Sequence, residues 1–384
     1  MKMYHRLVLP VVLLGLLVAI VAAACGGNSN SMLADSNLDD AVREALGKDK
    51  GDIEQADLEK LTTLDAHSRG IKDLTGLEYC TNLTSLNLAN NQISDVSPLS
   101  GLTSLTDLSL WMNQINDISM LSGLENLTSL RLSKNQIQDI TPLAELTDLR
   151  ILDLEWNQVM DAAPLSSLTS LNELNLGGNQ TIDIEPLSGL TNLTYLSLWM
   201  DGVSDITPLS GLTKLTFLDL AGNGISDITP IAGFTSLIEL QLGRNDISDI
   251  TPLSGITSLQ RLYIESNRIS DIIPLADLTN LTALKLGGNQ IQDISVVANF
   301  SKLTRLGLWI NQIRDIDALS NLNELTDLDL GHNQVSDITA LVENSGLGQS
   351  DIVELRENPL TRTAMYVQIP ELEQRGVTVN WTPL

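Results

Sequence analysis

Positive charge, cysteine and aromatic residues are all scarce in this sequence of 384 residues. Lys and Arg number 22 against 48 Asp and Glu, which gives a formal net charge of −26. Binding to phosphates needs clustered Lys and Arg, so this balance argues against a nucleic-acid partner. It suits a soluble surface protein or a cationic partner. Two cysteines, Cys25 and Cys80, are too few for a disulfide framework.

A repeat of 22 residues fills the middle of the chain, beginning with LTSLNLANNQISDVSPLSGLTSL at positions 83–105. One residue of the repeat is an asparagine in every copy but one, where Asp201 stands. These asparagines are Asn91, Asn113, Asn135, Asn157, Asn179, Asn223, Asn245, Asn267, Asn289, Asn311 and Asn333. Twelve copies with constant spacing predict a solenoid of the leucine-rich-repeat type.

Each repeat position has a predicted place when it is counted from the asparagine. Leucines at −8, −5 and −3 point inward, and residues at −6, −4 and −2 point outward, because side chains alternate along a strand. The strands are expected to stack in parallel into one sheet. The asparagine amide can satisfy backbone groups of its own coil and of the adjacent coil. Asp201 only accepts when ionised, so we expect a weaker contact between coils there.

The second half of the repeat reads I-x-D-I-x-P-L, and its proline recurs in eight copies. A recurring proline excludes a strand and breaks a long helix, so this side should form short 3₁₀ turns. The aspartate at +4 is expected to cap the turn that follows it. Weak Ca²⁺ binding along this aspartate column is an alternative, although one carboxylate per coil offers Ca²⁺ few ligands.

This D-I-x-P-L-x-x-L-T spacing resembles the internalin-like bacterial leucine-rich repeats, over residues 37–384. The resemblance implies an α/β solenoid with a parallel sheet on its concave face, 3₁₀ turns on its convex face and helical caps at both ends. It also implies a curved binding scaffold displayed outside the cell.

The N-terminus reads as a secretory signal at 1–24, with Lys2 and Arg6 before an apolar run. The small residues before Cys25 resemble a bacterial lipobox, which implies lipid attachment at Cys25, although Ala22 stands where that family usually has leucine. An ordinary cleaved signal and an uncleaved anchor are the alternatives. Residues 25–36 read as a flexible tether.

The remaining boundaries follow the repeat. Residues 37–80 are expected to form an N-terminal cap with a degenerate first coil, 81–345 the solenoid and 346–384 a C-terminal cap. In the first cap, Asn37 is the expected helix N-cap and Gly47 the stop, with a second helix near 56–61. In the last cap, a helix is expected to start at Pro370 and end at Gly376.

Catalytic motifs are missing. No HExxH, CxxC, P-loop or nucleophile elbow is present. His5 falls in the signal, and His67 and His332 lie too far apart along a solenoid to share a site. We therefore expect neither enzyme activity nor a metal site, and no cofactor.

Aromatic residues gather at outward strand positions. A content of 3% would place about one ring among the thirty-six outward positions of twelve repeats, yet six are found there. Exposed aromatics mark interfaces, and Trp, Tyr and Arg are enriched among hot spots. The predicted binding residues are Trp111, Trp156, Tyr195, Trp199, Phe217, Arg261, Tyr263 and Trp309. Tyr195, Trp199 and Phe217 form the expected centre, and packing of the rings on one another is the structural alternative.

These observations favour a monomeric, lipid-anchored recognition module at the bacterial envelope or surface, which binds an extracellular or envelope protein. A glycan ligand is the first alternative because flat rings also stack on sugars, and a structural surface protein is the second.

Overall fold

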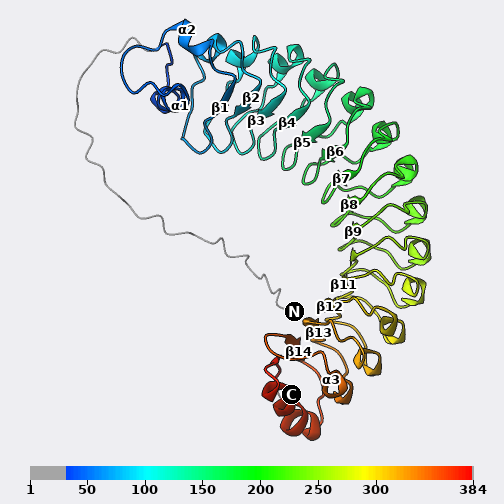
Figure 1. Cartoon of the computed structure of the whole chain (residues 1–384). Coiled ribbons are helices and arrows are strands. Elements are labelled where there is room, and N and C mark those ends of the chain that lie inside the picture. Colours follow the sequence, from blue (N-terminus) through cyan, green and yellow to red (C-terminus); the bar gives the residue numbers. More distant parts are fainter. Residues whose placement is uncertain (1–31, 383–384) are drawn as a thin grey trace, which may run out of the picture. The chain divides into compact units, whose positions relative to one another are not determined.

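Short parallel strands and tight helical turns alternate along residues 32–382, which are the residues that the computed structural model describes. The strands lie on the inner, concave side of a curved row of coils, and the turns lie on the outer, convex side (Figure 1). The expected leucine-rich-repeat fold is confirmed. The predicted signal peptide, Cys25 and residues 26–31 of the predicted tether lie outside the described residues.

The described strands form one sheet of 15 in chain order. They are β1 (Thr63–Asp65), β2 (Ser85–Asn87), β3 (Asp107–Ser109), β4 (Ser129–Arg131), β5 (Ile151–Asp153), β6 (Glu173–Asn175), β7 (Tyr195–Ser197), β8 (Phe217–Asp219), β9 (Glu239–Gln241), β10 (Arg261–Tyr263), β11 (Ala283–Lys285), β12 (Arg305–Gly307), β13 (Asp327–Asp329), β14 (Ile352–Glu354) and β15 (Thr378–Asn380).

The register of the sheet follows the repeat. Leu86 of β2 pairs with Leu108 of β3, and each further repeat strand places its leucine at the same level. These leucines are buried, and the residues on either side of each one point away from the core. A shift by a single residue would turn every leucine outward, so the burial of this column specifies the pairing.

The repeat asparagine joins neighbouring coils from inside. Asn113 Nδ2 donates to the carbonyls of Leu88 in the preceding coil and Leu110 in its own, both at 3.0 Å. Its Oδ1 accepts the backbone N–H of Ile93 at 3.1 Å. A buried backbone group without a partner destabilises a fold by about 1–3 kcal/mol, so this amide satisfies groups that the turn would otherwise leave open.

The convex turns are 3₁₀ helices as expected, and those from η2 to η12 each begin two residues after the column aspartate. They are η1 (Leu77–Tyr79), η2 (Ser97–Leu99), η3 (Ser119–Gly123), η4 (Thr141–Leu143), η5 (Ala163–Ser167), η6 (Glu185–Leu187), η7 (Thr207–Gly211), η8 (Thr229–Ile231), η9 (Thr251–Leu253), η10 (Ile273–Leu275), η11 (Ser295–Asn299) and η12 (Asp317–Leu319). The last full repeat differs, because an α-helix, α3 (Thr339–Glu343), replaces the 3₁₀ turn.

The aspartate column has the structural role that the sequence favoured. Asp95 Oδ1 accepts the backbone N–H of Ser97 at 2.8 Å, and Asp205 does the same for Thr207 at 2.8 Å. Hydrogen bonds from the threonine two positions on lower the pKa of Asp139 and Asp205. Among residues 32–382 no group of three or more His, Cys, Asp or Glu is placed to hold a metal ion.

The N-terminal cap begins with α1 (Ser36–Leu46), and its N-cap is Asp35 rather than the expected Asn37. Asp35 Oδ1 accepts the N–H groups of Asn37 and Leu38, while Oδ2 accepts that of Lys72, so one carboxylate caps the helix and holds it to the degenerate coil. The left-handed Gly47 ends the helix as predicted.

The second cap helix, α2 (Gln55–Leu58), is shorter than expected and begins at Gln55. Arg69 stands where the degenerate coil lacks the asparagine, and its guanidinium pairs with Glu44 of α1 at 2.5 Å. Cys80 is a free, buried thiol, and burial raises its pKa to about 12, in keeping with an inert core residue.

At the C-terminal end, a π-helical turn η13 (Ala364–Gln368) leads directly into α4 (Ile369–Gln374). The helical stretch therefore starts before Pro370, which is the second residue of α4 and comes directly after the π-helical turn. Trp381 packs on the apolar core at this end of the solenoid. No helix in the described part of the chain has the length and apolar character to cross a membrane.

The repeat asparagines that join successive coils form what we call the asparagine ladder. Asp201 is the one member of this ladder that is not asparagine, and it is only 2% exposed. Its Oδ1 accepts the backbone N–H of Asn179 at 2.8 Å. Its Oδ2 has no hydrogen-bond partner within the described structure. Burial raises the pKa of Asp201 to about 7, and hydrogen bonds from the N–H groups of Asn179 and Thr181 offset part of that rise.

The substitution Asp201→Asn should stabilise the fold, and by more at neutral than at acidic pH. The pKa is higher in the folded chain than its ordinary value of 3.8, so burial of the ionised carboxylate destabilises the fold increasingly as pH rises from about 4 to 7. The shift corresponds to at most about 4 kcal/mol. The melting temperature, followed by circular dichroism at several pH values, measures this.

The reverse change at another repeat asparagine, Asn245→Asp, is the matched control. It should lower the melting temperature above neutral pH. If Asp201→Asn leaves the melting temperature unchanged or lower at pH 8, Asp201 does not weaken the ladder.

Candidate functional site

The predicted binding residues lie in the strands of the concave side (Figure 1) or within three residues after them. Tyr195 and Phe217 are the first residues of β7 and β8, and Trp199 follows β7 by two residues. All three rings are partly exposed and none enters the core. Other copies of the repeat carry other types of residue at the positions of these rings. The solenoid itself therefore does not require the rings.

Tyr195 and Phe217 form a stacked pair. Parallel register places their Cα atoms opposite each other, and their ring centroids lie 4.3 Å apart at an interplanar angle of 3°. The spacing of adjacent strands therefore sets the stacking distance. Such a pair contributes about 0.5–1.5 kcal/mol beyond the area that it buries.

Trp199 and Trp156 form a second pair across two coils. Their centroids are 5.0 Å apart at 81°, an edge-to-face arrangement. Trp199 Nε1 donates to Glu155 Oε1 at 3.1 Å, which fixes the ring's orientation. Trp156 itself is 46% exposed.

Two glycines of the intervening coil make room for these indoles. A Cβ at Gly177 would lie 2.1 Å from Trp199 Cδ1, and a Cβ at Gly178 would lie 3.1 Å from the Trp156 ring. A Cβ at Gly287 would likewise lie 2.0 Å from the Trp309 Nε1 atom. A tryptophan at −2 thus lies over a glycine at −2 of the preceding coil in both places.

We call Trp156, Tyr195, Trp199 and Phe217 the aromatic platform. The structure joins these four predicted residues two by two, Trp156 with Trp199 and Tyr195 with Phe217. It places Arg261 beside the platform, where its Nε pairs with Glu239 at 2.5 Å. Tyr263 lies further along, with the Lys285 ammonium 5.1 Å from its ring centroid. Trp309 and Trp111 belong to other parts of the face.

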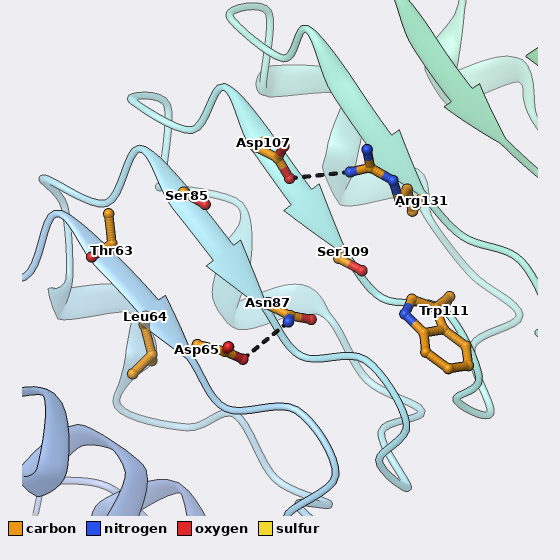
Figure 2. A pocket seen from close by; sticks show the side chains of 9 residues that line it. All are labelled: Thr63, Leu64, Asp65, Ser85, Asn87, Asp107, Ser109, Trp111 and Arg131. Carbon is orange, nitrogen blue, oxygen red and sulfur yellow. Dashed lines mark hydrogen bonds and ion pairs between the residues drawn. The ribbon is translucent and has the colours of Figure 1, made fainter. Parts of the chain in front are cut away.

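Trp111 borders a shallow hollow of about 390 Å³ over β1–β4 (Figure 2). Polar side chains from successive strands line it, among them Asn87, which donates to Asp65 at 3.0 Å. Asp107 and Arg131 form an ion pair of 3.5 Å on the opposite side of the hollow from Asp65 (Figure 2). Trp111 is 36% exposed and lies at the end of this polar strip.

Sequence reasoning missed a second column of exposed apolar residues at position −1. Met112, Trp156, Met200 and Ile310 all have positive φ and stand out from the rim of the sheet. Met200 directly follows Trp199 and extends the apolar surface beside the platform. Trp156 was predicted from the sequence and belongs to this column. The large apolar residues at the same repeat position could therefore have been recognised from the sequence as well.

Sequence reasoning also gave too little weight to the carboxylates around the platform. Burial raises the pKa of Tyr195 to about 12, with further contributions from Asp219, Asp153, Glu155 and Glu173. Burial likewise raises the pKa of Asp219 to about 6, with contributions from Glu239, Glu155 and Glu265. The rings and the acids therefore share one site.

The stacked coils and the accessible strand face define a leucine-rich-repeat recognition scaffold. A family model described as leucine-rich repeats in two copies matches residues 59–123, 125–167, 169–299 and 301–343 in overlapping segments. A comparison with curated proteins finds no match.

Solved structures place the chain more closely. An internalin of Listeria monocytogenes, InlF, is 41% identical with a TM-score of 0.80, over 82% of this chain and 94% of that one. The chain belongs to the internalin-like leucine-rich-repeat proteins. Proteins of this kind serve in protein–protein recognition, and the chain is a recognition module rather than an enzyme.

More distant structures share the fold alone. A leucine-rich-repeat protein of Leptospira interrogans is 23% identical with a TM-score of 0.74, over 81% of each chain. The plant peptide hormone receptor RGFR1, in complex with RGF2, is 21% identical with a TM-score of 0.62 and covers 74% of this chain and 48% of that one.

The substitution Gly177→Ala should displace the Trp199 indole while it leaves the solenoid folded. The new Cβ would overlap the ring, so the hydrogen bond to Glu155 must break. The indole N–H signal of Trp199 in an NMR spectrum, assigned through Trp199→Phe, should shift and exchange faster with water. Gly189→Ala is the control, because a Cβ there meets nothing within 4 Å. An unchanged Trp199 signal would contradict this packing.

Proposed function

We propose that this chain binds a protein partner on its concave face, with the aromatic platform as the centre of the interface. One observation carries the proposal: four large rings stand partly exposed on a rigid sheet whose core does not use them. Exposed apolar groups of this kind favour association, because water is released when a partner covers them.

The platform is ordered before a partner arrives. The rings restrict one another through the two ring pairs, and Trp199 also donates a hydrogen bond to Glu155. The indoles further pack closely on Gly177 and Gly178. Association therefore orders few side chains, which preserves more of the contact energy as affinity. The structural relative RGFR1, whose complex contains RGF2, supports a peptide or protein ligand on such a solenoid.

A glycan is the second candidate ligand, and the hollow beside Trp111 favours it. A partly exposed indole next to Asp65, Asn87, Asp107 and Arg131 combines a stacking surface with hydrogen-bonding groups, which is the combination a sugar ring needs.

We also propose display at the bacterial envelope. The sequence before Cys25 supports it, with a basic start, an apolar run and small residues. Two or more acyl chains on the mature N-terminus would hold the protein at the membrane, since one chain alone binds only reversibly.

The triple variant Tyr195→Ala, Trp199→Ala, Phe217→Ala should lose its partner and keep its fold. The matched control is Ile182→Ala, Ile273→Ala, Tyr366→Ala, which removes three exposed apolar side chains outside the strands. Wild type and control, immobilised and exposed to envelope and surface proteins, should retain the same protein, and the platform variant should not.

A glycan array with the same three proteins separates the ligand classes. Retention of the same partner by the platform variant, with an unchanged circular dichroism spectrum, would place the interface elsewhere. Binding to a glycan that Trp111→Ala abolishes would support the second candidate.

Cys25→Ser should move the protein from the membrane fraction to the soluble fraction and abolish its labelling by radioactive palmitate. Loss of the proposed acylation site removes the anchor, while export continues through the signal. Immunoblots of the two fractions measure the change. If Cys25→Ser remains in the membrane fraction to the same extent, Cys25 is not the anchor.

A further inference from the structure

Several carboxylates lie on the strands of the aromatic platform and on the strands next to them. Glu173 and Glu239 are the register partners of Tyr195 and Phe217, so a carboxylate lies at each end of the stacked pair. Asp219 ends β8 beneath Phe217, and Asp153 ends β5. Glu155 and Glu265 occupy the −2 column, and the Glu265 carboxyl lies over Gly243, 3.1 Å from where a Cβ would be.

Most of these carboxylates form no ion pair, although Arg131 of β4 is the register partner of Asp153. In residues 32–382, no ion pair of up to 4.0 Å joins Lys or Arg to Asp153, Glu155, Glu173, Asp219 or Glu265. One oxygen of Glu265 is buried without any hydrogen-bond partner in the described structure. Two other acids of the same face are paired, Glu239 with Arg261 and Asp107 with Arg131.

Burial makes this lack of cations unfavourable. Like charges on adjacent strands repel one another, and the repulsion grows where a surface excludes water. Asp219 accepts the backbone N–H of Ala221 at 2.9 Å, which satisfies one oxygen but supplies no positive charge. A cation placed among these groups would remove the repulsion, and the flat rings beside them attract cations as well.

We propose that the partner presents a basic segment to this face, with an arginine or lysine side chain seated between the aromatic platform and the unpaired carboxylates of β5–β10. This rests on the proposed function and names the chemistry of its partner. Guanidinium and ammonium groups form charge-assisted hydrogen bonds with carboxylates, and Arg also stacks on aromatic faces. The net charge of −26 attracts such a segment from a distance.

Binding should weaken in acid. Asp219 is surrounded by Tyr195 on β7, Glu239 on β9, Glu265 after β10 and Glu155 after β5, and Arg261 is engaged by Glu239. Burial and these acids raise the pKa of Asp219 to about 6. As pH falls through that value, Asp219 is protonated and one attractive charge is lost.

The test uses two synthetic peptides of equal length, one with regularly spaced arginines in a Gly/Ser background and one with glutamates at the same places. Tryptophan fluorescence at low salt follows their binding to the full chain. The variant Glu155→Gln, Asp219→Asn, Glu265→Gln removes three charges from the face. Its control, Glu125→Gln, Glu145→Gln, Asp148→Asn, removes three exposed charges outside the strands.

The arginine peptide should bind wild type and control equally, bind the face variant about tenfold more weakly or worse, and lose affinity between pH 7.5 and 5. The glutamate peptide should not bind. Equal weakening in both charge variants would show that net charge alone is responsible and would overturn the proposal, as would equal binding to all three proteins.

The partner captured in the test of the platform separates the proposed basic segment from the proposed binding of a protein to the concave face. If the Tyr195, Trp199 and Phe217 variant loses that partner while the face charge variant retains it fully, the concave face binds protein but not through a basic segment. If neither variant loses it, the proposed interface itself is wrong.

Discussion

The solenoid depends on the hydrogen bonds that a buried asparagine makes between one coil and the next. Each amide donates to carbonyls of both coils and accepts an N–H of the preceding one, as Asn113 does. Leucine burial drives the coils together, but it has no direction. The amide supplies direction, so the coils repeat at one spacing and one register. Asp201 shows the consequence, because a carboxylate in that position leaves one buried oxygen without a partner.

Regular stacking also explains how the binding face is built. Adjacent strands hold equivalent residues at a constant distance, so two rings at the same repeat position must stack, as Tyr195 and Phe217 do. Glycine in the neighbouring coil lets a tryptophan lie flat, as Gly177 does for Trp199. The same geometry gathers carboxylates on this face, where burial raises the pKa of Asp219 and Glu239, Glu155 and Glu265 add to the rise.

The convex side shows how the chain can carry many acids without forming a site there. Each column aspartate accepts the N–H that begins the next turn, and its pKa is lowered in members such as Asp205. On the concave side the acids have no such uniform role and lie beside aromatic rings. Acidity as a whole therefore says little about function, whereas the position of each carboxylate within the coil says a great deal.

The sequence by itself determined the solenoid, the inward leucines, the asparagine ladder and the outward column of rings, because a repeat imposes one environment on every copy. The N-terminal cap depends on a tertiary contact: the N-cap is Asp35 rather than Asn37, and its second oxygen also accepts the N–H of Lys72. Only the tertiary structure decided which rings meet. Trp156 and Trp199 contact each other across two coils, where Glu155 accepts a hydrogen bond from Trp199 and Gly177 leaves room for its ring. It also decided which carboxylates stay unpaired, because that depends on how far each side chain reaches along the sheet.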